Sequence, residues 1–395
     1  MEVTHLAHKI RLCPNLAQLT YFKQACGVAR FTYNWALVEW KRQYAIGECP
    51  SGPLLKRQFN ALRGEQFPWT YDVHRDCTSQ SFKHIQRAFI NFFEGVAGYP
   101  SFKRRGTADS FYIANDRLSL RGRYIRLPKI GWIKMREALR FTGKIVGATV
   151  KRLADAWFVI VQVDVGELRR ERRGDGSVGV DLGLRTSATL SSGEFIKGPK
   201  PLQAMLGKLR RLSRWLSRKQ RGSNNRRKSA MRLARLHRRI AWIRDDFLHK
   251  LTTRLCRENQ AVGIEDLNVR GLIRNRRLSR AIVDEGWGEF RRQLMYKSRL
   301  YGTQIHVADR WFPSSKICSG CGAIKSSLAL AERVFKCADC GVEIDRDTNA
   351  AVNLLPWDTR EVTPVDTGAL AGRPLPDGET AVDEAGISKC SQSNA

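Results

Sequence analysis

The sequence predicts a multidomain protein that combines α/β and α+β parts. Its 395 residues exceed what one compact hydrophobic core usually organises, so more than one domain is expected. Segments with helical spacing of apolar residues and segments with strand-like patterning occur in separate blocks along the chain. Near the C-terminal end, two C-x2-C motifs mark a small module of a different kind. Together these observations predict helical, strand-rich and α/β blocks and a metal-bound module.

The N-terminal half changes from helical to strand-like patterning. Residues 4–12 alternate well enough for a short strand, and apolar residues then recur at helical spacing through 15–47 and again through 73–97. Residues 107–165 contain short strand-like runs such as SFYIA and GWIKM, separated by glycine, proline and charged turns. We therefore expect two helical segments followed by a mostly antiparallel sheet or barrel.

The second half alternates between strands and helices. A polar, glycine-punctuated segment at 167–177 is the best candidate for a linker. VGVDLG, which starts at residue 178, and VGIEDL, which starts at residue 262, have the apolar pattern of buried strands. Between them, apolar residues at helical spacing on both sides of the turn-forming GSNN at 222–225 predict a helical hairpin. A final helix is expected to start within NAAVNLL at 349–355.

The charge of the chain is far more unusual than its hydrophobic content of 42%. Lys and Arg number 69 against 38 Asp and Glu, which gives a formal net charge of +31. The tail 358–395 holds seven acids and three bases, a net of −4, so residues 1–357 carry +35. Such an excess of base indicates a polyanionic partner. The tail itself, rich in Pro, Gly, Thr and acids, is expected to be a disordered acidic segment.

The densest basic segment coincides with the predicted hairpin. Between residues 208 and 244 there are fifteen Lys and Arg and no acid, with Trp215 among the arginines. One interpretation is a charged surface that only water covers. Like charges this close repel one another and have no intrahelical partner, which favours a phosphate-lined partner such as nucleic acid.

Several other classes of protein are disfavoured. No apolar run reaches the ~18 residues of a membrane helix, and MEVTHLAHKIRL at the N-terminus lacks the apolar core of a signal peptide. The chain is therefore expected in the cytoplasm, where its ten cysteines stay reduced. The sequence lacks a Gly-x4-Gly-Lys-Ser/Thr loop, which argues against an NTPase, and its seven histidines show no metal-ligand spacing.

The cysteine motifs carry the strongest local signal. CSGC and CADC each place two thiolates on one tight turn, and fifteen residues separate them. Four thiolates satisfy the tetrahedral coordination of one Zn²⁺ ion and leave no open position, so the ion would be structural. An iron centre and a redox dithiol are the alternatives, and the regular spacing favours neither. The predicted zinc ligands are Cys318, Cys321, Cys337 and Cys340.

Three acidic residues stand next to apolar sequence. Asp181 lies within VGVDLG, Glu265 lies within the closely similar VGIEDL, and Asp347 lies just before NAAVNLL. A carboxylate in a buried strand is costly unless a cation or hydrogen bonds compensate it. Three acids on separate elements are what a phosphodiesterase with two Mg²⁺ ions requires, although a single such Asp is often an ordinary structural residue. Asp266 competes with Glu265, and Asp345 competes with Asp347; spacing alone separates neither pair.

The segments GVDLGLRTSATLSSG, GIEDLNVRGL, KICSGCG, CADCG and DRDTNAAVNLL occur in one order. Together they resemble the TnpB (OrfB-type) proteins of bacterial insertion sequences, which are often labelled transposases. That family is similar to the type V CRISPR effector nucleases. HKIRLCPNLAQL, FTYNWAL and YPSFKRRG also resemble the family's N-terminal half, so the resemblance covers about residues 8–355.

The resemblance implies an RNase-H-like RuvC nuclease fold with an inserted zinc ribbon, preceded by a β-barrel with a helical insertion. It implies that Asp181, Glu265 and Asp347 are catalytic and hold two Mg²⁺ ions, since the family's last Asp precedes x-Asn-Ala-Ala. The implied domains are 1–12 for the first barrel strand, 13–97 for a helical recognition part, 98–168 for the rest of the barrel, 169–312 for the nuclease core with its hairpin at 205–250, 313–343 for the zinc ribbon, 344–357 for the last nuclease segment and 358–395 for the tail.

For function, the resemblance implies an RNA-guided, Mg²⁺-dependent DNA endonuclease of the bacterial cytosol or nucleoid. Its partners would be a guide RNA from the transposon end and a target DNA duplex with a short flanking motif. One alternative is an accessory or regulatory nucleic-acid-binding protein with an inactive nuclease, which three intact acids argue against. A strand-transferring transposase is a second, although no dedicated end-binding domain is recognisable. A standalone CRISPR effector is a third, for which the chain is small.

Overall fold

The computed structural model describes residues 5–107, 109–168, 170–329 and 331–356. These residues form two compact units. The N-terminal unit comprises His5–Arg152 and Ala156–Val165, and the C-terminal unit comprises Leu153–Asp155 and residues 166–356. The tail predicted to be disordered, 358–395, lies outside the described residues. Among the described helices, none is both long enough and apolar enough to cross a membrane.

The N-terminal unit contains a seven-stranded sheet, in agreement with the strand-like patterning of its sequence. The strands are β1 (His5–Cys13), β2 (Ser110–Ala114), β3 (Ser119–Arg121), β4 (Tyr124–Leu127), β5 (Gly131–Met135), β6 (Lys144–Leu153) and β7 (Ala156–Asp164). Their order is β2-β6-β7-β1-β5-β4-β3, and β1 runs antiparallel to both β5 and β7. Side chains alternate between exposed and buried along the whole of β1, so one face of this strand lies on the core.

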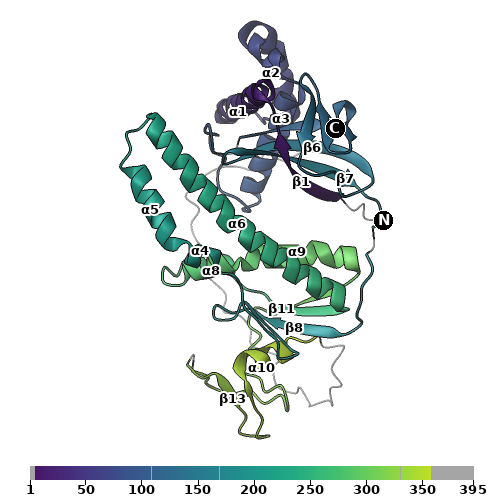
Figure 1. The fold of residues 1–395 in the computed structure, drawn as a ribbon, viewed down its shortest axis with the longest axis vertical. Helices are drawn as coiled ribbons and strands as arrows, with labels where there is room; N and C mark the ends of the chain where they lie inside the picture. The colour runs from purple at the N-terminus through teal and green to yellow at the C-terminus, as the bar shows by residue number, and fades with distance from the viewer. Residues whose placement is uncertain (1–4, 108, 169, 330, 357–395) are drawn as a thin grey trace. The chain divides into compact units, whose positions relative to one another are not determined.

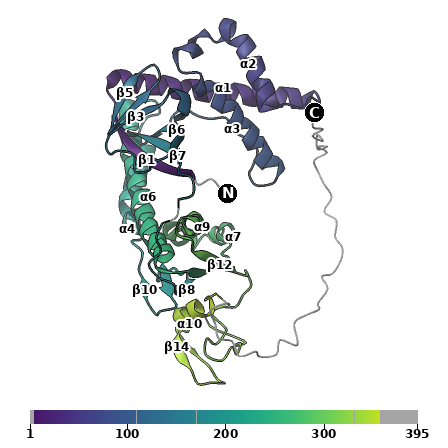
Figure 2. The ribbon, with the colours of Figure 1, turned by 90° about the vertical axis from the view of Figure 1, so that its right-hand side faces the viewer.

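Three helices accompany this sheet, and two of them were expected from the sequence (Figures 1 and 2). The helical elements are α1 (Leu16–Ala45), α2 (Gly52–Gln66) and α3 (Asp76–Phe93), with short 3₁₀ turns at Pro68–Asp72 and Asn115–Arg117. α1 begins at Asn15, whose side chain forms a reciprocal capping box with Gln18. Phe22 of α1 packs against Phe111 and Trp157 at ring-centroid distances of 5.7 and 4.9 Å, which joins the helix to the sheet in one core.

The C-terminal unit contains a second, mixed sheet in the order β10-β9-β8-β11-β12. β8 (Ser177–Asp181), β11 (Ala261–Glu265) and β12 (Gln304–Ala308) run parallel to one another. β9 (Ala188–Leu190) pairs antiparallel with β8, and β10 (Phe195–Ile196) pairs antiparallel with β9. α6 (Asn224–Glu258) and α9 (Trp287–Tyr301) lie on one face, and α10 (Arg346–Asn353) lies on the other (Figures 1 and 2). The two segments predicted to be buried strands are thus the neighbouring strands β8 and β11.

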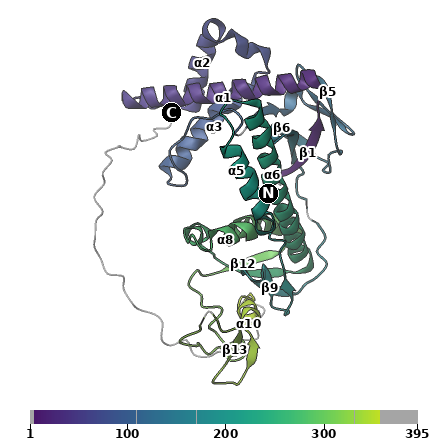
Figure 3. The ribbon, with the colours of Figure 1, turned by 60° about the vertical axis from the view of Figure 1, so that its left-hand side comes forward.

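The basic segment forms the predicted helical hairpin. α5 (Leu206–Ser217) and α6 lie side by side (Figure 3) and share an apolar core of Leu212, Leu236 and Ile240. α6 begins at Ser223, whose hydroxyl accepts a hydrogen bond from the Arg226 N–H group. The remaining elements are α4 (Pro201–Ala204), α7 (Val269–Ile273), α8 (Ser279–Glu285), β13 (Val334–Lys336) and β14 (Glu343–Asp345).

Candidate metal centres

Two of the predicted carboxylates lie at the carboxyl ends of neighbouring parallel strands. Asp181 is the last residue of β8, and Glu265 is the last residue of β11. The register pairs Val180 with Ile264, the residues just before the two acids. Val180 and Ile264 are buried, whereas both acids are half-buried. Because the carboxyl ends of parallel strands meet at one edge of a sheet, the two acids belong to the same region.

Two glycines allow the helix that carries Asp347 to lie directly on these strands. A Cβ atom at Gly179 of β8 would stand 1.8 Å from the Ala351 carbonyl oxygen. One at Gly263 of β11 would stand 1.7 Å from the Leu354 carbonyl oxygen. No side chain fits at such distances, so glycine is required where the backbone of α10 approaches the sheet. Each glycine precedes its acid by two residues, in VGVD and in VGIE.

Neighbouring carboxylates act electrostatically on Asp181. The pKa of Asp181 is raised to about 8, first by burial, then by the carboxylates of Glu265 and Asp347, and least by that of Asp345. The guanidinium of Arg346 acts in the opposite direction. A half-buried acid opposed by three other carboxylates is stabilised as a carboxylate when a cation binds beside it. The arrangement therefore fits a site for divalent metal.

Asp345, the alternative to Asp347, has a structural partner. It is the N-cap of α10, and its carboxylate accepts hydrogen bonds from the backbone N–H groups of Asp347 and Thr348, each at 3.0 Å. The carboxylate of Asp347 forms an ion pair with Arg346 at 3.0 Å. Asp345 thus holds the backbone of the first helical turn, and Asp347 extends from that turn.

Asp266, the alternative to Glu265, is held by two arginines. It forms ion pairs with Arg310 and Arg291, which lower the pKa of Asp266. Glu265 instead accepts a hydrogen bond from the Ser314 hydroxyl at 2.6 Å. The two consecutive acids therefore have different surroundings, a pair of cations for Asp266 and a neutral donor for Glu265.

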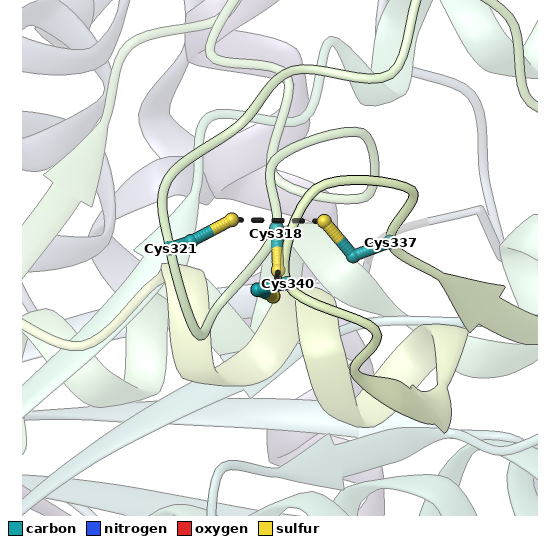
Figure 4. A group of neighbouring side chains, drawn as sticks. All are labelled: Cys318, Cys321, Cys337 and Cys340. Atoms are coloured by element: carbon teal, nitrogen blue, oxygen red, sulfur yellow. Dashed lines mark hydrogen bonds between the residues drawn. The ribbon is translucent and has the colours of Figure 1, made fainter.

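The four predicted zinc ligands come together in the structure (Figure 4). Their Sγ atoms all lie within 4.8 Å of one another. The Sγ atoms of Cys318 and Cys340 are 3.6 Å apart, as are those of Cys321 and Cys337. Thiolates at ~2.3 Å from a tetrahedral Zn²⁺ ion would stand about 3.8 Å apart, so the cluster fits zinc. The glycine that follows each C-x2-C motif has a positive φ, which lets the turn close.

Hydrogen bonds join the first cysteine motif to α10 and to Glu265. Asn353 of α10 donates to the carbonyl oxygens of Ser314 and Ile317, at 2.8 and 2.6 Å. Asn349 donates to the same Ile317 carbonyl at 2.7 Å. Both asparagines are fully buried, and Ser314 also donates to Glu265. These polar residues were not predicted from the sequence; the available signal was two asparagines one helical turn apart in NAAVN.

Three protein-family models match the chain. A model of OrfB_IS605 type with the description "Probable transposase" matches residues 160–276, and a Cas12f1-like TNB domain matches residues 287–354. A helix-turn-helix domain of OrfB_IS605 type matches residues 1–49. Residues 5–49, the described part of the range that the helix-turn-helix model matches, form the strand β1 and one long helix, α1.

A protein from Streptomyces pristinaespiralis is 36% identical to this chain, and the match covers 90% of each sequence. Its name describes an RNA-guided DNA endonuclease. The chain belongs to the TnpB (OrfB_IS605) family. A second TnpB-family relative with such a name, from Escherichia coli strain K12, is 32% identical over 88% of this chain and 91% of its own. The resemblance that the motifs indicated is therefore confirmed.

Among solved structures, a complex of Cas12f1 with sgRNA and target DNA has a similar fold. The match covers 86% of this chain and 84% of that chain, with a TM-score of 0.54 and 14% sequence identity. At this level of identity the likeness concerns the fold alone. It confirms that the TnpB-family chain has a mixed α/β architecture similar to that of a type V effector.

The basic hairpin of this TnpB-family chain presents its charges unequally. Arg235 and Arg238 of α6 form ion pairs with Asp155 at 2.8 and 2.9 Å. Arg210 and Arg214 of α5 are exposed and form no ion pair within the described part of the chain. Arg210 and Arg214 therefore keep a charge that no acid compensates, whereas Asp155 compensates Arg235 and Arg238.

Proposed function

We propose that this chain is an RNA-guided, Mg²⁺-dependent DNA endonuclease encoded by a transposable element. The observation that carries the proposal is the convergence of Asp181, Glu265 and Asp347 from β8, β11 and α10. Carboxylates from separate elements around one half-buried acid are a ligand set suited to a two-Mg²⁺ phosphodiesterase. The names of two relatives, RNA-guided DNA endonucleases, support the same activity.

The proposal includes the finer architecture. The C-terminal sheet would be an RNase-H-like core of RuvC type. Its strand order supports this, because the antiparallel strands β10-β9-β8 are followed by the parallel strands β8-β11-β12. The N-terminal strands would form a β-barrel interrupted by α1, α2 and α3. The zinc ribbon at 313–343 would be an insertion before the last nuclease segment at 344–357.

Residues around the acids would prepare them for two ions. The Ser314 hydroxyl orients Glu265, and the Asp345 N-cap fixes the turn that carries Asp347. Bound Mg²⁺ would supply the Lewis acidity and the activated nucleophile that phosphodiester hydrolysis needs. Among the described residues, the cysteine group is the one whose ligand atoms all lie within 4.8 Å of one another. The three acids are not so close together. Two ions about 4 Å apart need carboxylates that are spread over both ions, so a wider spacing suits them.

Guide RNA and target DNA would balance the net charge of +31. Trp215 of α5 is 45% exposed, and the guanidinium of Arg211 lies 5.7 Å from its ring centroid, a combination suited to phosphate and base contacts. The RNA would come from the end of the transposon, the target duplex would carry a short flanking motif, and the site of action would be the bacterial cytosol or nucleoid.

Co-purified RNA tests the proposal directly. The full chain is expressed together with its native flanking DNA, and the bound RNA is sequenced. The purified complex should then cut a duplex matched to that RNA when Mg²⁺ is present, and it should stop when EDTA is added. A complex that binds RNA and the matched duplex but never cuts would indicate an accessory binding protein instead. Joined rather than cut strands would indicate a transposase.

Arg210 and Arg214 of α5 should contribute more to the salt dependence of nucleic-acid binding than Arg235 and Arg238 of α6. We expect Arg210→Gln with Arg214→Gln to flatten the plot of log Kd against log salt by about 0.7–0.9 for each phosphate that is no longer neutralised. Arg235→Gln with Arg238→Gln removes the same number of charges, but Asp155 already neutralises those side chains, so the slope should change less. Equal slopes for the two double variants would contradict a binding role for α5.

A further inference from the structure

A hollow of about 410 Å³ opens beside Glu265 in the C-terminal unit. Glu265 itself lines it, and so does Leu182, the residue that follows Asp181. The hollow therefore borders the edge of the sheet where the carboxylates lie. Its volume falls within the range of ordinary small-molecule sites, and it is formed by residues that follow β11, by α7 and by the start of α9.

The lining of the hollow combines apolar surface with arginines. Leu267, Trp287 and Phe290 contribute apolar side chains, and the two aromatic residues are buried. The arginines that line it are Arg270, Arg291 and Arg310. This is the chemistry that suits a nucleotide, because the flat base favours apolar contact and the phosphate favours guanidinium groups.

The arginines differ in how firmly they are held. Asp266 forms ion pairs with Arg291 and Arg310, whose side chains remain 42% and 49% exposed. Arg270 is exposed and forms no ion pair within the residues that the structure describes. Asp266 thus acts as a positioning residue for two arginines, while Arg270 keeps its full charge for an anionic ligand.

We propose that this hollow receives the base of the nucleotide that adjoins the scissile phosphate, with Arg270 contacting its phosphate. The proposal rests on the proposed nuclease function and adds a nucleotide subsite to it. Glu265 and Asp266 are consecutive, so one acid belongs to the metal site and the next fixes arginines of the hollow. A DNA strand held at Glu265 would accordingly place a neighbouring base at the hollow.

Gly288 allows the hollow to be filled without disturbing the fold. It lines the hollow in the first turn of α9, its φ is not positive, and a Cβ atom there would meet nothing within 4 Å. Gly288→Phe should therefore occupy the space without a backbone clash, and replacing glycine within a helix favours the helix. Gly288→Ala adds little volume at the same position and is the matched control.

Abasic substrates test the subsite. The complex, with its own RNA, is given guide-matched duplexes that carry one abasic nucleotide at successive positions around the cut. In the wild-type complex an abasic nucleotide at one position next to the cut should lower kcat/KM about tenfold, the scale expected for the loss of one base contact. Gly288→Phe should lower kcat/KM for intact DNA by a similar factor and should no longer respond to the abasic nucleotide at that position. Gly288→Ala should behave as the wild type.

Identical abasic profiles for Gly288→Phe and Gly288→Ala would overturn the proposal, as would a wild-type profile that is flat on both sides of the cut. Arg270→Gln offers a second route that does not depend on filling the hollow: KM should rise several-fold, kcat should stay near wild type, and the salt slope should fall. An unchanged KM in that variant also counts against the subsite. Failure of the nuclease function itself would look different, because the wild-type complex would then not cut at all.

Discussion

Alanine at Asp181, Glu265 or Asp347 is expected to lower Mg²⁺-dependent cleavage of guide-matched DNA by at least about 10²–10³-fold, the scale on which loss of one main electrostatic stabiliser acts. Each carboxylate would hold a cation that stabilises charge in the transition state. Binding of RNA and target should survive, because most phosphate contacts come from Lys and Arg. Cleavage rates and filter-binding affinities, measured on the same preparations, check both halves of the expectation.

The flanking acids provide controls, and the structure determines how they must be changed. Asp345→Ala would remove the N-cap of α10 and could displace Asp347 indirectly, at a cost of about 1 kcal/mol. Asp345→Asn keeps the accepting oxygen and removes only the charge, so it should retain most activity, whereas Asp347→Asn should not. If Asp345→Asn were inactive and Asp347→Asn active, the residue assignment would be wrong while the chemistry stood. Normal cleavage by all three alanine variants would end the nuclease proposal.

Loss of zinc is expected to abolish cleavage although zinc takes no part in the chemistry. Cys318→Ser or Cys340→Ser should release the ion, because a structural zinc site contributes about 10 kcal/mol or more to local folding. The first cysteine motif is hydrogen-bonded through Ile317 to Asn349 and Asn353 of α10, the helix that carries Asp347. Release of zinc should therefore misplace the third acid. Native mass spectrometry gives the zinc content, and the cleavage assay gives the consequence.

A cysteine outside the cluster serves as the control for this experiment. Cys13 is exposed at the end of β1 in the other unit, so Cys13→Ser should keep one zinc ion and normal cleavage. Full zinc content in both Cys318→Ser and Cys340→Ser would contradict the four-cysteine assignment. Zinc loss with normal cleavage would instead show that α10 keeps its place without the ribbon.

Features that depend on residue type and local spacing could be predicted without a structure. Four cysteines in two C-x2-C motifs predicted a zinc site in preference to an iron centre or a redox dithiol, because each motif places two thiolates on one tight turn. A carboxylate in an apolar strand pattern stands out because burial makes it costly, which marked Asp181 and Glu265. The fifteen Lys and Arg residues between 208 and 244 predicted a surface for a phosphate-lined partner, because like charges so close along the chain repel one another.

Features that depend on distant partners follow from the packing of the folded chain. Asp266 and Glu265 are adjacent in sequence, and they differ because Arg291 and Arg310 reach one while Ser314 reaches the other. The pairing of Arg235 and Arg238 with Asp155, some 80 residues away in the chain, is equally absent from local pattern. Gly179 and Gly263 are ordinary strand glycines until α10 lies on them. These contacts join segments far apart in the chain, so packing and not spacing gives neighbouring residues their different surroundings.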